Sequence, residues 1–381
     1  MLYGNILTPD GWRLGSLNWQ AGRISVIDGE AVDPKTNAYP RILPGFVDLH
    51  VHGGGGADAM EGGDAATTLA RTHARFGTTS LLVTTMTAPL DDIRRVLAET
   101  AQVVSAGPDQ GARVLGVHLE GPYLNPDKLG AQPPHARPGT IEAMEALLAL
   151  APIRLVTLAP ELQGHAALIR HLADRGVRVQ LGHTLASYEE GVAALGHGAS
   201  GFTHLFNAMT GLHHREPGVV GAALAHAEYA EIIPDLLHVH PGAIRAALRS
   251  IPRLYAVTDS TSAAGMPDGD YRLGEQHVVK CLGGVRLADG TLAGSTLTMD
   301  QALRNFVEIG LDLAEASDRL SRFPAEFLGE TDVGRLAPGA HADIAVFSPA
   351  LELEAVYVGG ERLDSVAGDH ATPLPTSEES V

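Results

Sequence analysis

Cysteine is almost absent from this chain of 381 residues, which contains one. Cys281 has no partner for an internal disulfide, so a reducing compartment such as the cytoplasm is expected. We expect the thiol itself to pack within a strand-like run. The sequence also lacks an apolar run long enough to span a bilayer, and residues 1–15 lack the basic start of a secretory signal. These absences predict a cytoplasmic protein with no membrane partner.

Basic residues are scarce too, since 27 Lys and Arg stand against 45 Asp and Glu, a net charge of −18. Nucleic acids and anionic membranes are bound by basic faces, so this balance argues against either as a partner. An anionic substrate would have to be met by a local exception to the overall charge. Hydrophobic residues make up 45% of the chain and charged residues 19%, which favours a globular protein with a large core.

Segments rich in β-type residues lie at both ends of the chain. Short strand-like pieces occur at residues 22–27 (GRISVI) and again at 342–347 (ADIAVF), broken by Gly, Asp and Pro. We therefore expect a small β-sandwich built from residues 1–42 plus 334–367. Residues 368–381 are rich in Pro, Ser, Thr and Glu without apolar periodicity, which predicts a flexible tail.

The middle of the chain, residues 43–333, alternates strand-like and helix-like runs. Eight apolar runs begin near Leu43, Thr79, Val114, Arg154, Val177, Gly201, Ile232 and Leu254. This alternation predicts an α/β fold, a (β/α)₈ TIM-type barrel, with the seventh strand over residues 232–238. Residues 271–292 have hairpin texture, which predicts an insertion near the active-site face.

Polar residues close several of these apolar runs. They are His50, His52, Glu120, His183, His204 and Asp259. A (β/α)₈ barrel builds its active site at the carboxyl ends of its strands, and residues i and i+2 of a strand share a face. Imidazole and carboxylate donors without thiolate suit zinc, with iron(II) and cobalt(II) as alternatives. Any one of these histidines could instead be a buried core residue. Six donors together predict one divalent ion, or two that share a carboxylate.

The strings around these residues resemble a known family. PGFVDLHVHG is similar to the opening of the amidohydrolase superfamily. The N-acetylglucosamine-6-phosphate deacetylases of that superfamily have strings similar to HLEGPYLN, GAQPP, LGHT, THLFNAM, HHREPG, VTDSTSAAG and LAGSTLTMDQALRN. The resemblance covers nearly the whole chain. It implies a metal-dependent barrel with a β-sandwich companion, and hydrolysis of N-acetyl-D-glucosamine 6-phosphate to D-glucosamine 6-phosphate and acetate.

The resemblance also implies roles for single residues. Glu120, His183 and His204 match the family's main metal ligands, and Asp259 matches its catalytic acid/base. Near the end of the seventh run, His238 is expected to bond the substrate carbonyl or a sugar hydroxyl. The positions matching substrate contacts are Ala131, Gln132, Asn207, Ala208, Arg215, Asp235, Leu236, Leu237, His238, Leu292, Ala293 and Gly294. The family also implies a homodimer, in which Arg215 would bind phosphate in its own or the neighbouring active site.

Two departures from other members of the superfamily carry information. Some deacetylases replace the His-x-His pair by amides and hold one ion, whereas His50 and His52 are intact here, which leaves one or two ions open. Gln132 stands where other members have His. Cyclic amidases bridge two ions with a carbamylated lysine on the fourth strand, but RLVTLAPE contains none, so bridging falls to Glu120. The alternatives are another amidohydrolase (a cyclic amidase or a deaminase) and a non-catalytic barrel that serves in assembly.

Overall fold

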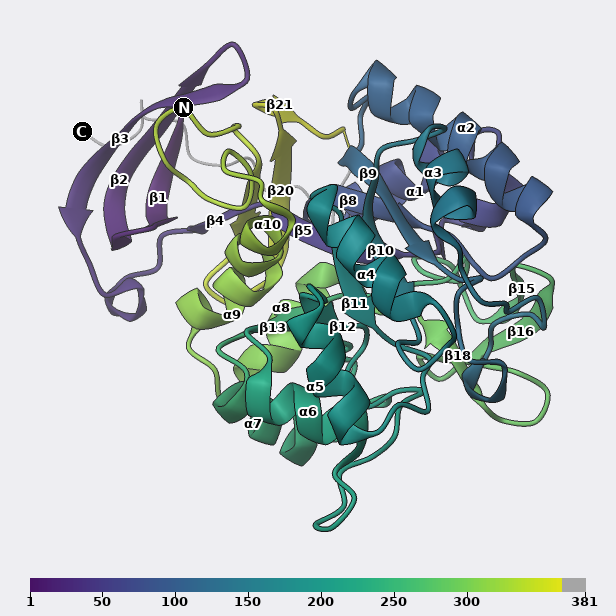
Figure 1. Cartoon of the computed structure of the whole chain (residues 1–381). Coiled ribbons are helices and arrows are strands. Elements are labelled where there is room, and N and C mark those ends of the chain that lie inside the picture. The colour runs from purple at the N-terminus through teal and green to yellow at the C-terminus, as the bar shows by residue number, and fades with distance from the viewer. Residues whose placement is uncertain (365–381) are drawn as a thin grey trace, which may run out of the picture.

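The computed structural model describes residues 1–364, and the predicted tail at 368–381 lies outside the described residues. Figure 1 shows two parts, a sheet formed by both ends of the chain and a larger body of alternating strands and helices. No helix within the described residues is long and apolar enough to cross a membrane.

Both termini contribute strands to one mixed sheet of seven, which we call the terminal sheet. Its order is β21-β20-β19-β4-β1-β2-β3. The strands are β1 (Leu2–Thr8), β2 (Gly11–Gln20), β3 (Arg23–Ala31), β4 (Arg41–Pro44), β19 (Ile344–Phe347), β20 (Leu353–Val358) and β21 (Glu361–Arg362). β4 joins the two ends because it pairs with β1 on one side and β19 on the other. A separate apolar cluster that includes Ile6, Leu17 and Ile24 stabilises this sheet.

Eight parallel strands form the barrel, as predicted. They are β5 (Phe46–Val51), β8 (Thr78–Thr84), β9 (Arg113–Glu120), β10 (Ile153–Leu158), β11 (Arg178–Leu181), β12 (Gly201–Phe202), β13 (Tyr229–Ile232) and β14 (Arg253–Ala256). The strands from β5 to β12 form one sheet and β13 pairs with β14. Backbone bonds of 2.9 Å from Leu205 N to Glu231 O and from Asp259 N to His50 O close the two gaps. The (β/α)₈ barrel with a small β domain formed by both chain termini is therefore confirmed, and the part predicted as a β-sandwich is one mixed sheet of seven strands.

Helices cover the outside of the barrel (Figure 1). They are α1 (Ala65–Ala74), α2 (Leu90–Ala106), α3 (Ile141–Leu148), α4 (His165–Asp174), α5 (Tyr188–Gly196), α6 (Gly218–His226), α7 (Pro241–Ser250), α8 (Met299–Glu308), α9 (Leu313–Leu320) and α10 (Arg322–Leu328). Local sequence explains them. In α8, for example, Met299, Leu303 and Phe306 recur at helical spacing and are fully buried. α5 begins at a reciprocal cap between Ser187 and Glu190.

The predicted C-terminal ends of two barrel strands were wrong. The seventh strand does not run to His238 but stops at Ile232, because the Asp235 side chain accepts bonds from the backbone N of Leu237 and of His238 and closes a turn there. The sixth strand ends at Phe202, so His204 lies beyond it in a turn.

The hairpin texture over residues 271–292 correctly predicts an insertion. Four antiparallel strands form it, namely β15 (Gly269–Leu273), β16 (Gln276–Cys281), β17 (Gly284–Arg286) and β18 (Leu292–Ser295). Cys281 is exposed at the end of β16, so the expectation that it packs was wrong.

The run that opens at Leu43 is shared between the two parts of the molecule. β4 pairs within the terminal sheet and β5 within the barrel, and Gly45 separates them. A side chain at Gly45 would clash, since a Cβ there would lie 2.2 Å from the Thr79 side chain. The division of the chain at residues 42 and 43 and at 333 and 334 stays a prediction, and the strand pairing favours Gly45 for the first boundary.

Candidate metal centre and active site

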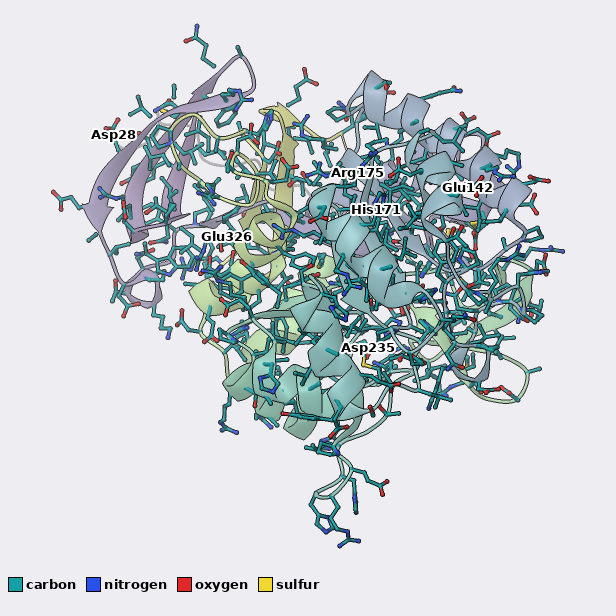
Figure 2. All side chains as sticks on the ribbon, in the orientation of Figure 1. Asp28, Glu142, His171, Arg175, Asp235 and Glu326 are labelled. Carbon is teal, nitrogen blue, oxygen red and sulfur yellow. The ribbon has the colours of Figure 1, made fainter. Side chains whose placement is uncertain are left out.

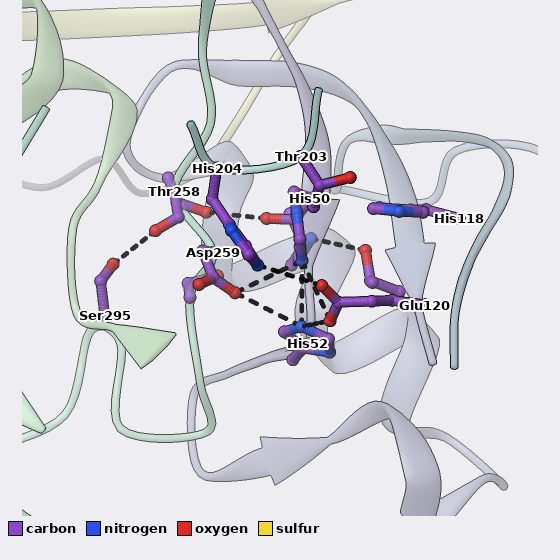
Figure 3. Close-up of polar contacts among 12 residues, drawn as sticks. His50, His52, His118, Glu120, Thr203, His204, Thr258, Asp259 and Ser295 are labelled. Atoms are coloured by element: carbon purple, nitrogen blue, oxygen red, sulfur yellow. Dashed lines mark hydrogen bonds and ion pairs between the residues drawn. The ribbon is translucent and has the colours of Figure 1, made fainter. Parts of the chain in front are cut away.

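A cavity of about 370 Å³ opens at the carboxyl ends of the barrel strands. Figure 3 shows His50, His52, Glu120, His204 and Asp259 pointing toward one another from the ends of several strands. β5 carries His50 and places His52 just after it, and β9 ends at Glu120. Convergence of polar groups from separate strands is how this fold forms an active site.

The first donor group consists of Glu120, His183 and His204. The Oε1 atom of Glu120 lies 3.2 Å from Nε2 of each histidine, and the two Nε2 atoms are 3.1 Å apart. Ligands bound about 2.0–2.1 Å from one tetrahedral zinc lie roughly 3.3 Å from each other. The separations therefore fit a single divalent ion held by three protein ligands, with a fourth position open to the cavity.

The second donor group consists of His50, His52, Asp259 and the other oxygen of Glu120. Nε2 of His50 is 3.1 Å from Nε2 of His52, 3.4 Å from Asp259 Oδ1 and 3.5 Å from Glu120 Oε2. From His52 Nε2 the same oxygens are 3.3 and 3.1 Å away. One carboxylate oxygen of Glu120 thus faces each group, which is the arrangement of a bridging ligand.

Burial and charge set the protonation of these groups. Burial disfavours the cation of His50, but the carboxylates of Glu120, Asp259 and Glu231 outweigh it and raise the pKa well above its usual value. Burial acts on His52 in the same way, and its bonds to Asp259 and Glu120 raise the pKa to about 9. Burial would favour neutral Glu120 and Asp259, yet the surrounding histidines lower the pKa of both.

Several buried polar atoms of the centre have no partner within the described residues. They include Nδ1 of His52, Nδ1 of His204 and Oε1 of Glu120. An unpartnered buried acceptor is costly, and Glu120 Oε1 sits where a cation would be bound. The donors are nitrogen and oxygen without sulfur, a set that suits zinc and related divalent ions. The residues present therefore fit a metal centre.

Neighbouring groups orient the donors from behind. The Nδ1 atom of His183 donates to the backbone O of Lys128 at 2.8 Å, which leaves Nε2 free for a ligand. Gln132 accepts from the backbone N of Thr87 at 2.6 Å and donates from Nε2 to Glu120 Oε2 at 2.7 Å. The oxygen end of this amide is thus anchored to Thr87, and the nitrogen end holds Glu120.

Strained backbone marks the strand ends. His183, His204 and Asp259 have φ values of 48°, 29° and 48°, a region that residues with side chains rarely adopt. Gly53, directly after His52, is needed for close approach, since a Cβ there would lie 2.3 Å from Ser262 N. Such strain persists where surrounding contacts fix it, and it clusters at functional sites.

Most of the predicted residues line the cavity. They are His52, Glu120, Ala131, Gln132, His183, His204, Asn207, Ala208, His238, Asp259, Leu292 and Gly294. His50 lies beneath and is fully buried. Five predicted substrate residues do not line it, namely Arg215, Asp235, Leu236, Leu237 and Ala293.

The reasons for these five differ. Asp235 bonds His238, with 2.6 Å between Oδ2 and Nδ1, and so orients that ring. Leu236 is partly buried against the main apolar core, Leu237 is about half exposed, and Ala293 is fully buried. Figure 2 labels Asp235, in the turn that follows β13. Arg215 lies in an exposed loop, and its guanidinium contacts His214 of the same loop at 2.8 Å.

Sequence reasoning missed part of the cavity wall. Met86, Asp127, Lys128, Gly130, Leu273 and Thr291 line it as well. The position of Met86 at the end of the second predicted strand was a usable signal. Leu273 and Thr291 belong to the inserted hairpins, whose contact with the cavity no local pattern reveals.

Comparisons with known proteins place these features in context. Residues 41–363 match the Amidohydrolase family. The chain is 41% identical to N-acetylgalactosamine-6-phosphate deacetylase of Escherichia coli O157:H7, over 93% of this chain and 97% of that one. It is 40% identical to N-acetylglucosamine-6-phosphate deacetylase of Vibrio furnissii, over 89% and 88%.

Solved structures of deacetylases are also similar to this chain. N-acetylglucosamine-6-phosphate deacetylase of Thermotoga maritima has a TM-score of 0.88 at 32% identity, covering 95% of this chain and 99% of that one. A variant of the Mycobacterium smegmatis deacetylase, solved with N-acetyl-D-glucosamine 6-phosphate, has a TM-score of 0.87 at 34% identity, covering 96% and 98%. The cyclic amidase, deaminase and non-catalytic alternatives gain no support from these relatives, and β10 contains no lysine.

Proposed function

Since this chain belongs to the amidohydrolase family and, within it, to the N-acetylglucosamine-6-phosphate deacetylases, we propose that it hydrolyses the acetamide of N-acetyl-D-glucosamine 6-phosphate. The products are D-glucosamine 6-phosphate and acetate. The observation that supports this function most strongly is the position of the two donor groups. They lie on either side of Glu120, and both open to one cavity. Buried carboxylates and histidines in such contact are arranged for a metal-assisted hydrolysis.

The metal centre would hold one or two divalent ions, with zinc as the first candidate and iron(II) and cobalt(II) as alternatives. Glu120, His183 and His204 would hold the tighter ion, and His50, His52 and Asp259 would hold the second with Glu120. When bound, the ions supply an acidified water and polarise the substrate carbonyl.

Asp259 acts as the general base and then the general acid. Its lowered pKa keeps the carboxylate ionised, so it can take a proton from the attacking water and hand it to the departing amine. His238 lines the same cavity, and Asp235 fixes its ring so that Nε2 faces inward. From there it donates to the carbonyl oxygen or a sugar hydroxyl, which supports catalysis by placing a donor where charge develops.

The sugar phosphate is bound by the cavity rim. Asn207, Ala208 and Lys128 line it, and the lysine offers a local positive charge in an otherwise acidic protein. Arg215 is exposed and does not line its own cavity, which supports the proposal that two chains form a homodimer in which it serves the partner's substrate. A cytoplasmic location accords with the exposed thiol of Cys281, which reducing conditions preserve.

N-acetyl-D-galactosamine 6-phosphate is a second candidate substrate. The relative at 41% identity is named for that sugar, whereas the relative at 40% is named for the glucose epimer. The two sugars share the acetamide and the phosphate and differ in the orientation of one hydroxyl, so the same chemistry serves both.

Acetate release tests the proposal. The zinc-loaded protein is given each of the two 6-phosphates and, as controls, unphosphorylated N-acetylglucosamine and a cyclic amide. We expect the highest kcat/KM on N-acetyl-D-glucosamine 6-phosphate and loss of activity after chelation. A higher kcat/KM on the galactosamine sugar would select the second candidate. No acetate from either 6-phosphate would refute the function.

A further inference from the structure

A carboxylate that the proposed chemistry does not use lies beneath the metal centre. Glu231, on β13, is fully buried. Its Oε2 atom is 3.0 Å from Nδ1 of His50 and 3.2 Å from the backbone N of His204. One oxygen of Glu231 thus touches a member of each donor group.

The chemistry of this contact fixes the state of the His50 ring. A carboxylate oxygen can accept a hydrogen bond but has none to donate, so Nδ1 of His50 must carry the proton. In the neutral ring, the form that binds a metal ion, the lone pair is then on Nε2, which faces Asp259 and Glu120. Such a carboxylate–histidine pair orients a ligand ring and raises its basicity.

Other rings of the centre lack this arrangement. Nδ1 of His52, the second imidazole of the same group, has no partner within residues 1–364. His183 is held by a neutral backbone oxygen instead. The second group therefore depends for its orientation on His50 and, through it, on Glu231.

A different use of this carboxylate, as a ligand in a third ion site with His50 and His118, conflicts with the bonding there. The three side chains do lie close together. However, Nδ1 of His118 donates to Leu49 O at 3.1 Å, and its Nε2 contacts the Thr157 hydroxyl at 2.7 Å. Both nitrogens of His118 are occupied, so the cluster is a hydrogen-bonded support.

We propose that Glu231 is a positioning residue that determines occupancy of the second metal site. It holds His50 with Nε2 toward the ion, and its negative charge, one imidazole away, favours a cation there. The inference rests on the proposed two-ion centre. Glu231 meets the first site only at the backbone N of His204, whereas the donor atoms of Glu120, His183 and His204 contact one another, so the first site should persist without Glu231.

Metal content measured on the full chain tests this role. Glu231→Gln keeps the length of the side chain and removes its charge. Glu231→Asp keeps the charge but has a shorter side chain, so the carboxylate lies farther from His50. Each protein is reconstituted with zinc, and ions per chain and their affinities are measured by elemental analysis and chelator competition. His50→Gln is the reference for loss of the second ion. Asp343→Asn is the matched control, because Asp343 is also a buried carboxylate but bonds Gly359 N in the terminal sheet.

We expect two ions in the unmodified protein and in Asp343→Asn. Both Glu231 variants should retain the first ion and bind the second about 10–100-fold more weakly. Two ions at unchanged affinity in both Glu231 variants, with one in His50→Gln, would overturn the role of Glu231 alone. One ion in every protein would overturn the two-ion centre and this inference with it. The predicted metal pattern without acetate release would support Glu231 and refute the deacetylase function instead.

Discussion

The carboxyl end of the barrel and the terminal sheet differ in how much strained backbone and buried charge they contain. Within residues 1–364, six of the ten non-glycine residues with positive φ follow barrel strands at the cavity end: His183, His204, Phe206, Ala208, Leu236 and Asp259. Buried histidines and carboxylates also gather there. The terminal sheet instead packs side chains such as Ile6, Leu17 and Ile24 into an apolar cluster.

This difference indicates how each part of the molecule affects the free energy of folding. Strained backbone and buried charge both destabilise a fold, and the barrel end retains them because metal and substrate require them. The terminal sheet contributes burial of apolar surface, about 25 cal/mol per Å². Substitutions at the barrel end should therefore change chemistry more than stability, and substitutions in the terminal sheet should do the reverse.

His183→Ala should have the largest effect on activity. It removes one of three donors of the tighter site, so the first ion should be lost and turnover should fall by about a thousandfold or more. Zinc content and acetate release check this. His171→Ala is the matched control, since His171 pairs with Glu145 on the outer surface of α4, away from the cavity. Full zinc content in His183→Ala would remove His183 from the ligands.

Asp259→Asn should come next, with turnover reduced by at least about a hundredfold, because an amide cannot take and return a proton. The tighter ion should remain, since Glu120, His183 and His204 are unchanged. Rates measured under substrate saturation, alongside zinc content, separate loss of proton transfer from loss of metal. Unchanged turnover would exclude Asp259 as the acid/base.

Much of both regions could be predicted from the sequence, because local patterns of apolar and polar residues reveal strands and strand ends. The same reliance on local patterns limits what can be predicted. Alternating apolar runs reveal strands, and polar residues that close them reveal a site, so Glu120 and His183 could be found directly. Contacts made by side chains distant in sequence leave no such pattern. Glu231 interrupts the short apolar strand YAEI, a signal that was passed over, and its contact with His50 needs the closed barrel.

The predictions of where strands end were wrong for a related reason. The apolar run at residues 232–238 resembles a strand, but Asp235 bonds the backbone N–H groups of the two residues that end the run and turns the chain. A side chain such as that of Asp235 can bond backbone N–H groups that would otherwise bond a neighbouring strand. This competition does not change the pattern of apolar residues, so the pattern does not reveal where the strand ends.

Arg215→Ala should act on binding at the cavity rim. We expect a several-fold to tenfold rise in KM for the phosphorylated sugar, with kcat nearly unchanged and activity on unphosphorylated N-acetylglucosamine unaffected. Arg170→Ala is a suitable control, because Arg170 is also exposed and also contacts a histidine, His197, at 2.8 Å. Mixing Arg215→Ala with the inactive His183→Ala protein tests sharing between subunits. Recovery of low-KM activity in the mixture is expected if the arginine serves the partner, and no recovery would assign it to its own chain.

Leu17→Ala should have the smallest effect on turnover and a large one on stability. Leu17 is fully buried in the cluster of the terminal sheet, so truncating it should lower the free energy of unfolding by about 2–5 kcal/mol. Leu17→Met, which keeps the volume, should cost less than about 1.5 kcal/mol. Denaturant unfolding, zinc content and kcat are compared at a temperature where all three proteins are folded. If kcat or zinc content fell in step with stability, the terminal sheet would be supporting the metal centre directly, and the separation between the two regions would not hold. Unchanged values would mean that the chemistry depends on the closed barrel and its strand ends alone.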